Sequence, residues 1–196
     1  LHDALQHSGF ELCDADLAEA PIDELLDGVD AVAHLAGQPG VRSSWADGFE
    51  VHVQRNIVAT QRLLEAVRRC GSRRVVYASS SSVYGDAETF PTPEDVVPQP
   101  VSPYGVTKLA AEHLATLYGT NFGLPTVSLR YFTVYGPRQR PDMAIQRMIA
   151  AALGGPTFTL FGNGAAARSF TFVDDVVAAN IAALTADIPP GTVVNL

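Results

Sequence analysis

Two short stretches decide how this chain folds, Val75-Val-Tyr-Ala-Ser-Ser-Ser-Ser-Val-Tyr-Gly85 and Ser102-Pro-Tyr-Gly-Val-Thr-Lys108. In the first, residues 75–78 predict a buried strand that runs into four serines. In the second, Ser102 can cap the free N–H groups of a helix, and a proline suits the next position because it has no N–H to lose. A strand followed by a helix is typical of a parallel sheet with helices packed on it.

Tyr104 and Lys108 lie four residues apart, and therefore on one face of the predicted helix. A phenol is a poor base at neutral pH because its pKa is about 10. A neighbouring ammonium and the positive end of a helix both favour the phenolate, and a serine hydroxyl from the strand end can share the proton. These groups predict a proton-transfer site for a sugar or alcohol hydroxyl.

Lys108 is the only lysine among thirteen basic residues, and the others are all arginines. An ammonium is compact and its pKa shifts readily on burial, so arginine does not replace it. The spacing alone leaves open a second interpretation, a surface lysine beside a half-buried tyrosine. The serines and the strand–helix pattern argue against that interpretation.

The composition limits the classes of function. The chain has 196 residues, 47% of them hydrophobic and 17% charged, which is typical of one globular domain with part of a second. A net charge of −8 argues against a nucleic-acid or anionic membrane surface as partner. Cys13 and Cys70 show no metal-binding or redox spacing, so we expect buried thiols in a cytoplasmic protein, and no metal site.

Strands and helices alternate along the rest of the sequence, which predicts an α/β fold whose parallel sheet is covered on both faces. Ligands bind at the carboxyl ends of such strands, where Asp14, Ala36, Gly37, Ser79–Ser82 and Thr133 are expected. The predicted strands are residues 10–13, 29–35, 74–78, 126–131, 157–161 and 192–196. The predicted helices are residues 22–26, 49–70, 103–118, 141–154 and 174–185, with Asp174 as a cap, a turn over 162–164 and an exposed loop over 86–101.

Several motifs in order resemble one family. They include His34-Leu-Ala-Gly37, Arg55-Asn-Ile-Val-Ala-Thr60, Val83-Tyr-Gly85, Leu129-Arg-Tyr-Phe-Thr-Val-Tyr-Gly-Pro137 and Arg168-Ser-Phe-Thr-Phe-Val-Asp-Asp175, besides the Tyr104 and Lys108 stretch. With them the chain resembles the extended short-chain dehydrogenase/reductase family, in its nucleotide-sugar epimerase/dehydratase branch. The resemblance implies a Rossmann-like doubly wound sheet, an NAD-binding domain over 1–135, and over 136–196 part of a substrate-binding subdomain with a returning helix and strand.

The resemblance also implies the site. Tyr104 is the expected base, Lys108 the residue that holds the nicotinamide ribose and lowers the tyrosine pKa, and Ser80 the catalytic hydroxyl. The residues expected at NAD are Asp14, Ala15, Leu35, Ala36, Gly37, Asn56, Ser79, Tyr104, Lys108 and Phe132, and those expected at the substrate are Ser80, Ser81, Ser82, Thr133, Arg140 and Arg168. Simpler alternatives remain for three of them: Asn56 as a tie between helix and loop, Asp14 as a turn residue, and Arg168 as a solvent-facing charge.

The glycine-rich turn that opens the family's fold has no counterpart in this sequence. Its first predicted strand resembles the family's third, and the last helices of the family have no match. The resemblance therefore predicts an internal piece of a longer enzyme, which is expected to bind NAD weakly or not at all. Ser169 also stands where an aspartate is usual, which puts the surroundings of Arg168 in doubt.

The residues before Val83 bear on the reaction. Dehydratases of this branch usually carry a glutamate, often after an aspartate, where Ser82 and Ser81 stand here, so the resemblance favours 4-epimerisation. The segment Thr133 to Ala144 is similar to that of UDP-glucuronate 4-epimerases, in which Arg140 would meet the sugar carboxylate. UDP-glucose or UDP-galactose as substrate, a dehydratase, and a non-catalytic cofactor-binding regulator or scaffold remain alternatives. Family analogy predicts a homodimer through helices 49–70 and 103–118.

Overall fold

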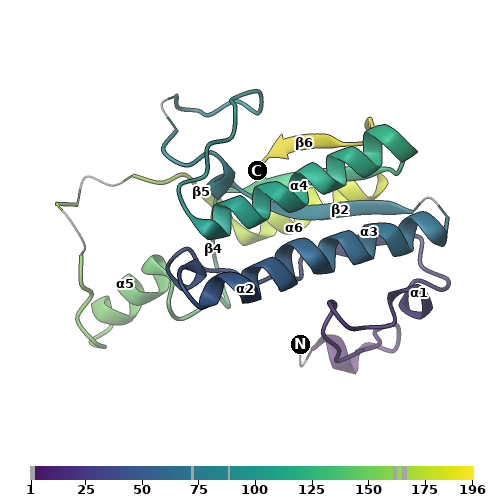
Figure 1. The fold of residues 1–196 in the computed structure, drawn as a ribbon. Helices are drawn as coiled ribbons and strands as arrows, with labels where there is room; N and C mark the ends of the chain where they lie inside the picture. Colours follow the sequence, from purple (N-terminus) through teal and green to yellow (C-terminus); the bar gives the residue numbers. More distant parts are fainter. Residues whose placement is uncertain (1–2, 72, 88, 161–162, 165–166) are drawn as a thin grey trace.

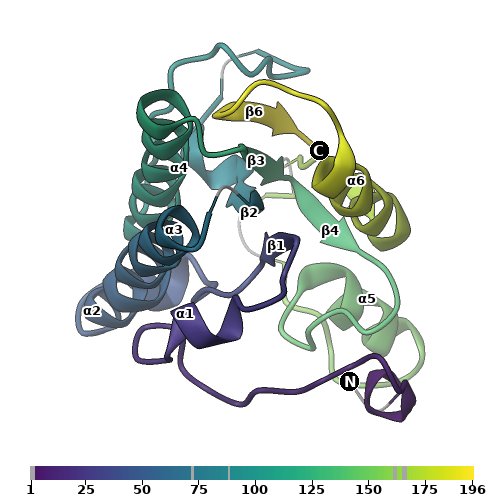
Figure 2. The same cartoon turned by 90° about the vertical axis from the view of Figure 1, so that its right-hand side faces the viewer.

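A four-stranded parallel sheet runs through the molecule in the order β1-β2-β3-β6 (Figures 1 and 2). The strands are β1 (Ala31–His34), β2 (Arg74–Ser80), β3 (Thr126–Tyr131) and β6 (Thr192–Asn195). The structure is a computed structural model that describes residues 3–71, 73–87, 89–160, 163–164 and 167–196. Strands β2 and β3 are almost entirely buried, as the sequence predicts, whereas β1 and β6 are largely half-buried.

Helices cover both faces of this sheet. Figure 2 shows α3 (Ala59–Arg69) and α4 (Pro103–Phe122) on one face and α6 (Val173–Thr185) on the other. α2 (Gly48–His52) leads through a π-helical segment, Val53–Val58, into α3, so the predicted helix 49–70 is present with an irregular turn inside it. The described part of the chain contains no helix both long and apolar enough to cross a bilayer. The remaining helical pieces are α1 (Ile22–Leu25), α5 (Ala144–Ala152) and the 3-10 turns Ala4–Gln6, Arg42–Ser44 and Ser81–Val83.

Side chains of β2 alternate between the two faces, because successive residues of a strand point in opposite directions. Val75 and Tyr77 pack in the core under α3 and α4. Val76 packs on the other side with Leu129 of β3 and Ala183 of α6. This two-sided burial explains the continuous apolar run of β2, and it confirms the predicted α/β, Rossmann-like doubly wound class.

α4 begins where its sequence predicts. The Ser102 hydroxyl accepts a hydrogen bond from the Gly105 N–H at 3.1 Å, and Pro103 occupies the first turn. The helix continues to Phe122, beyond the predicted end at 118, and Gly123 ends it in the left-handed conformation, at φ +65°. The cap therefore fixes the residue at which this helix begins, and with it the place of Tyr104 in the first turn.

Two predicted strands are wrong. Residues 10–13 form no strand, and Phe10 and Leu12 are exposed. A strand of this length needs a neighbour to take its backbone hydrogen bonds, and among the described residues β1 pairs only with β2. Residues 157–160 are also irregular, while 161 and 162, from the predicted strand and turn, lie outside the described residues.

The structure adds a small second sheet that the sequence analysis missed. β4 (Thr133–Tyr135) pairs in parallel with β5 (Phe170–Phe172). Strands of three residues are too short to show a periodic pattern. α6 begins at Val173 with Phe172 as its cap residue, so the predicted cap Asp174 instead lies in the first turn, where a carboxylate favours the helix dipole.

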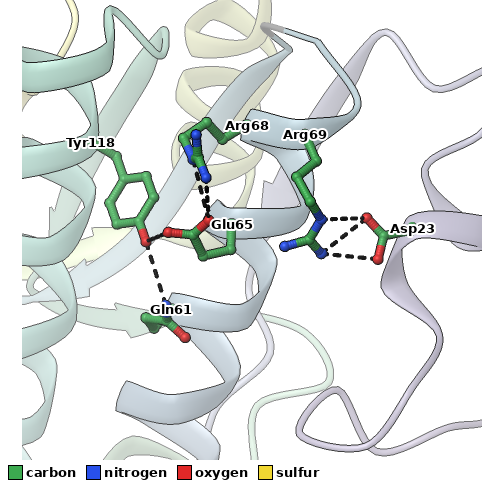
Figure 3. A network of polar contacts seen from close by, with 6 residues as sticks. All are labelled: Asp23, Gln61, Glu65, Arg68, Arg69 and Tyr118. Carbon is green, nitrogen blue, oxygen red and sulfur yellow. Dashed lines mark hydrogen bonds and ion pairs between the residues drawn. The ribbon is translucent and has the colours of Figure 1, made fainter.

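A polar network joins α1, α3 and α4 at the end of α4 away from Tyr104 (Figure 3). Arg69 of α3 pairs with Asp23 of α1 at 2.9 Å. On the neighbouring face of α3, the Tyr118 hydroxyl donates a hydrogen bond to Glu65, which also pairs with Arg68 at 2.9 Å. The contacts hold the two long helices in register, and the exposed Arg69–Asp23 pair contributes only about 0–1 kcal/mol.

Candidate active site

Ser80 and Tyr104 meet at the carboxyl edge of the sheet. Ser80 ends β2, and its hydroxyl accepts a hydrogen bond from the Ser82 N–H at 3.1 Å as the chain turns. Ser80 lies close enough to Tyr104, in the first turn of α4, for its hydroxyl to act on the pKa of the phenol. Gly105 makes this close approach possible, because a Cβ there would lie 2.5 Å from the Ser82 carbonyl oxygen.

The electrostatics of Tyr104 differ from the expectation. Burial raises the pKa of Tyr104, while the Ser80 hydroxyl and the positive charge of Arg140 act in the opposite direction. The depressed pKa expected from Lys108 is therefore not present in this structure. The Lys108 ammonium lies instead 4.4 Å from the centre of the Tyr77 ring. Arg140 is thus the cation whose charge acts on Tyr104.

Lys108 is buried one turn further along α4, with 7% of its surface exposed. Burial lowers its pKa to about 8, and the charge of Glu112 acts against that shift. No described residue accepts a hydrogen bond from the ammonium, which faces the Tyr77 ring. Its three N–H donors are therefore available to a ligand.

Asn56 lies in the π-helical segment, an irregularity that often marks functional sites. Its Oδ1 accepts from the Gln38 N–H at 2.7 Å, and its Nδ2 donates to the Gln38 carbonyl at 3.1 Å and to the Thr107 hydroxyl at 2.9 Å. Asn56 therefore ties the loop after β1 to the second turn of α4. This geometry gives direct support to the structural alternative for Asn56.

His34, at the end of β1, is buried against the same region. Its Nε2 is 2.8 Å from the Thr60 hydroxyl, which itself donates to the Asn56 carbonyl at 2.7 Å. The hydroxyl proton is thus committed, so His34 donates from Nε2 to Thr60. Burial, with a smaller contribution from the charge of Lys108, lowers the His34 pKa to about 3.

We expect stability to fall as the pH drops from about 6.5 towards 3, partly because of His34. In the unfolded chain histidine binds a proton at pKa 6.5, whereas the folded His34 does so only at about 3. The unfolded state therefore holds more protons in this window, and His34 alone removes about 1.4 kcal/mol of stability per pH unit. Urea unfolding of the parent and His34→Gln between about pH 4 and 7 measures this. Equal slopes in the two proteins would contradict the prediction.

The other residues expected at the cofactor do not all lie together in the structure. Leu35, Ala36 and Gly37 are exposed at the end of β1, whereas Asp14 and Ala15 are exposed in the irregular segment that was expected to be a strand. Because that strand is absent, no strand pairing places Asp14 and Ala15 beside β1. The Ser79 hydroxyl donates to Glu112 at 2.5 Å, so its side chain is committed to the protein interior.

Two cavities are lined by four of the six expected substrate residues, and Ser80 and Thr133 line neither of them. Ser81, Ser82, Phe132 and Arg168 line one of about 400 Å³. Arg140 lines another, of about 700 Å³, and pairs with Asp142 at 3.0 Å. The Thr133 N–H donates to the Ser169 carbonyl at 3.1 Å, which places β4 beside the Arg168 segment. Arg168 itself is exposed and donates to the carbonyl of the preceding residue.

A buried group of charges was missed by the sequence analysis. Glu112 of α4 and Arg130 of β3 form an ion pair of 2.7 Å, with 2% and 5% of their side chains exposed. Arg130 also donates to the Tyr84 hydroxyl at 2.5 Å. A glutamate four residues after Lys108, and an arginine inside the apolar strand 126–131, were the available signals.

Family comparison agrees with this geometry. The model of the NAD dependent epimerase/dehydratase family matches residues 2–196. The chain belongs to the NAD-dependent epimerase/dehydratase family. This epimerase/dehydratase-family chain is 45% identical over its whole length to a Bacillus subtilis protein named as an uncharacterised UDP-glucose epimerase, YtcB, of which it covers 62%.

Other members of the epimerase/dehydratase family are similar over most of this chain. A UDP-glucuronate 4-epimerase of Thermodesulfobacterium geofontis is 43% identical over 80% of the chain and 48% of the relative. The crystal structure of UDP-glucuronic acid 4-epimerase from Bacillus cereus with UDP-glucuronic acid and NAD superposes with a TM-score of 0.94, at 44% identity, over 99% of this chain and 62% of that one. The chain therefore spans less than two thirds of the length of these relatives.

Proposed function

We propose that this chain supplies the catalytic residues of an NAD-dependent nucleotide-sugar 4-epimerase. The observation that carries the proposal is the meeting of Ser80 and Tyr104 at the end of β2, with Lys108 buried one turn along α4. Similarity to epimerases solved with NAD and UDP-sugars supports it. A cofactor-binding regulator or scaffold, the alternative of another class, has no need of this arrangement of side chains.

The residues present fit NAD. Lys108 has donors for a ribose, and the exposed end of β1 leaves backbone for the cofactor to approach at Gly37, where Asn56 Oδ1 lies 2.9 Å from the place of a Cβ. When bound, NAD supplies a reversible hydride acceptor. We assign to it, as the family resemblance implies, Asp14, Ala15, Leu35, Ala36, Gly37, Asn56, Ser79, Tyr104, Lys108 and Phe132.

Tyr104 would take the proton of the sugar C4 hydroxyl when that carbon is oxidised, and would return it to the same oxygen when the carbon is reduced again with the opposite configuration. Ser80 lies beside the phenol and would orient it for this transfer. The reaction stays an epimerisation because Ser81 and Ser82 carry hydroxyls, which cannot protonate a leaving group at neutral pH. A dehydratase is the runner-up reaction.

UDP-glucuronate is our first choice of substrate and UDP-glucose or UDP-galactose the second. The positive charge of Arg140 acts on Tyr104, which supports a place for a carboxylate near the reacting hydroxyl. Thr133 and Arg168 complete the proposed substrate contacts with Ser80, Ser81 and Ser82. The similarity to a protein named as a UDP-glucose epimerase keeps the second choice open.

Arg140→Ala is expected to raise KM for UDP-glucuronate about 10- to 100-fold and to leave UDP-glucose turnover almost unchanged. A charge-assisted hydrogen bond of this kind contributes about 1.5–3 kcal/mol. Steady-state kinetics with both sugars measures the ratio. Arg138→Ala is the matched control, because Arg138 lies two residues away and pairs with Asp3 at the exposed surface. Equal effects on both sugars would rule out the carboxylate contact.

The function is tested by NAD binding and turnover. Calorimetric titration with NAD, on this chain and on the whole protein, is followed by a coupled assay with UDP-glucuronate and UDP-glucose. Binding with turnover of either sugar supports the epimerase. NAD binding without turnover of any nucleotide sugar would favour the regulator, and absence of NAD binding in the whole protein would overturn both.

The assembly and location are also proposals. Apolar side chains remain exposed on the outer helices, among them Phe49 and Val51 of α2 and Leu117 and Phe122 of α4, which supports a homodimer through these helices. Cys13 and Cys70 are free thiols, which supports a cytoplasmic protein, but the expectation that both are buried is wrong, because Cys13 is exposed and Cys70 is half-buried. We retain a cofactor-binding part over 1–135 and a mixed substrate-binding part over 136–196.

A further inference from the structure

The carboxylate of Glu112 is saturated with hydrogen bonds inside the protein. Arg130 donates to both of its oxygens, from Nη2 to Oε1 at 2.7 Å and from Nε to Oε2 at 3.0 Å. The Ser79 hydroxyl donates to Oε2 at 2.5 Å. A buried carboxylate that is held in this way keeps its position.

The position of Glu112 relates it to the catalytic residues. It lies four residues after Lys108 and eight after Tyr104 on α4, so the three share one face of the helix. Its partner Ser79 immediately precedes Ser80 on β2. The carboxylate therefore contacts the strand that carries the catalytic serine and lies one turn from the catalytic lysine.

The network continues from Arg130 to a side chain that lines the proposed substrate cavity. Arg130 Nη1 donates to the Tyr84 hydroxyl at 2.5 Å, and Tyr84 donates to Asn195 of β6 at 2.8 Å. The Asn195 N–H is bound in turn by Glu94, in the loop 86–101, at 2.8 Å. Tyr84 lines the cavity that Ser81 and Ser82 share. Glu112 thus belongs to a continuous set of contacts between three strands, α4 and a loop.

The groups that face Lys108 come from several elements. Tyr104 and Glu112 lie on its own helix, Tyr77 lies under its ammonium on β2, and His34 lies on β1. Among these only Glu112 carries a buried negative charge. It acts to keep the ammonium protonated, while burial favours the neutral amine.

We propose that Glu112 is a positioning residue of the catalytic centre, which acts through Lys108 because its carboxylate is held buried one helical turn from that side chain. Arg130 weakens the influence of Glu112 on Lys108, because its guanidinium partly neutralises the same carboxylate. The proposal rests on the proposed function in one respect, namely that Lys108 takes part in the epimerase reaction. The coupling between the two side chains is a property of the folded chain itself.

Lys108 is the only lysine of the chain, so its titration can be followed directly. Selective ¹³C labelling of lysine gives one side-chain Cε signal, whose shift reports the charge of the ammonium between about pH 6 and 11. Glu112→Gln is expected to move the midpoint to lower pH, because a negative charge is lost. Arg130→Gln is expected to move it to higher pH, because the carboxylate is then less neutralised.

The opposite directions separate an electrostatic role from a structural one. A purely structural role would move both midpoints the same way or neither, and either result would overturn the proposal. If one variant fails to fold, the midpoint of the other is compared with that of the parent and of Glu65→Gln, and no shift or a shift of the wrong sign overturns the proposal. Glu65→Gln is the matched control, because Glu65 also accepts from an arginine and a hydroxyl (Figure 3). Its partner Tyr118 lies ten residues after Lys108, which is about 15 Å further along α4.

The activity of the whole enzyme gives the second readout. The alkaline limb of the kcat profile should follow the Lys108 midpoint down in Glu112→Gln, with kcat about tenfold lower near pH 8 and KM within about twofold. If the two midpoints shift in opposite directions but the parent enzyme turns over no nucleotide sugar, the epimerase is refuted and the coupling between Glu112 and Lys108 stands. Full turnover in Glu112→Gln, with an unmoved profile, would refute the positioning role and leave the epimerase.

Discussion

Tyr104→Phe is expected to lower kcat for 4-epimerisation by about 10²- to 10⁴-fold. The substitution removes only the hydroxyl, which lies beside Ser80 and is the single group at this position able to accept the C4 proton. Burial raises the pKa of Tyr104, so ionisation of the phenol favours the reaction at higher pH, while loss of the Lys108 charge near pH 8 opposes it. NAD affinity should change less than about twofold, because the ring and its contacts remain.

A matched control lies on the same helix. Tyr118 also carries a buried ring and a hydrogen-bonded hydroxyl, but its partner is Glu65, at the other end of α4 (Figure 3). Tyr118→Phe should keep kcat and lose about 1 kcal/mol of stability. Steady-state kinetics and urea unfolding of both variants measure the contrast. Retention of more than about a tenth of kcat in Tyr104→Phe would mean that another group is the base.

Arg130→Met is expected to cost about 3–5 kcal/mol of stability. The substitution leaves Glu112 charged and buried without its ion partner, and it removes the donor to Tyr84. Stability of a domain this size is of order 5–15 kcal/mol, so the variant should unfold at markedly lower urea concentration. Equilibrium unfolding followed by circular dichroism gives the difference.

Two companion variants interpret that result. Replacing both partners, Glu112→Leu with Arg130→Met, removes the unpaired charge and should recover much of the loss. Arg69→Met is the surface control, because Arg69 and Asp23 pair at similar distance with about half of each side chain exposed, and should cost no more than about 1 kcal/mol. A loss in Arg130→Met no larger than that in Arg69→Met would contradict the assigned role of burial.

Local chemistry explains which elements were predictable. The Ser102 cap, the following proline and the apolar runs of β2 and β3 act within a few residues, so their signals survive in the sequence. The predicted strand 10–13 has the same kind of apolar pattern but no neighbouring strand to pair with. β4 and β5 show the reverse case, because each is stabilised by a partner distant in the chain and has almost no pattern of its own.

The candidate site divides in the same way. The spacing of Tyr104 and Lys108 put them on one face of a helix, and the serine run put Ser80 at a strand end. The direction of the Tyr104 pKa could not be predicted, because it depends on how deeply the ring is buried and on which charges act on it. The charge of Arg140 acts on Tyr104 although the two residues are 36 positions apart in the sequence.

The sequence by itself determined the α/β class and the start of α4, and it supplied the residues that we propose for proton transfer, since all depend on short-range periodicity, capping and spacing. Only the tertiary structure decided that Glu112 of α4 meets Arg130 of β3 and Ser79 of β2. Such a contact joins residues of three separate elements, and two charges stay in a dry interior only when folding brings both of them there together.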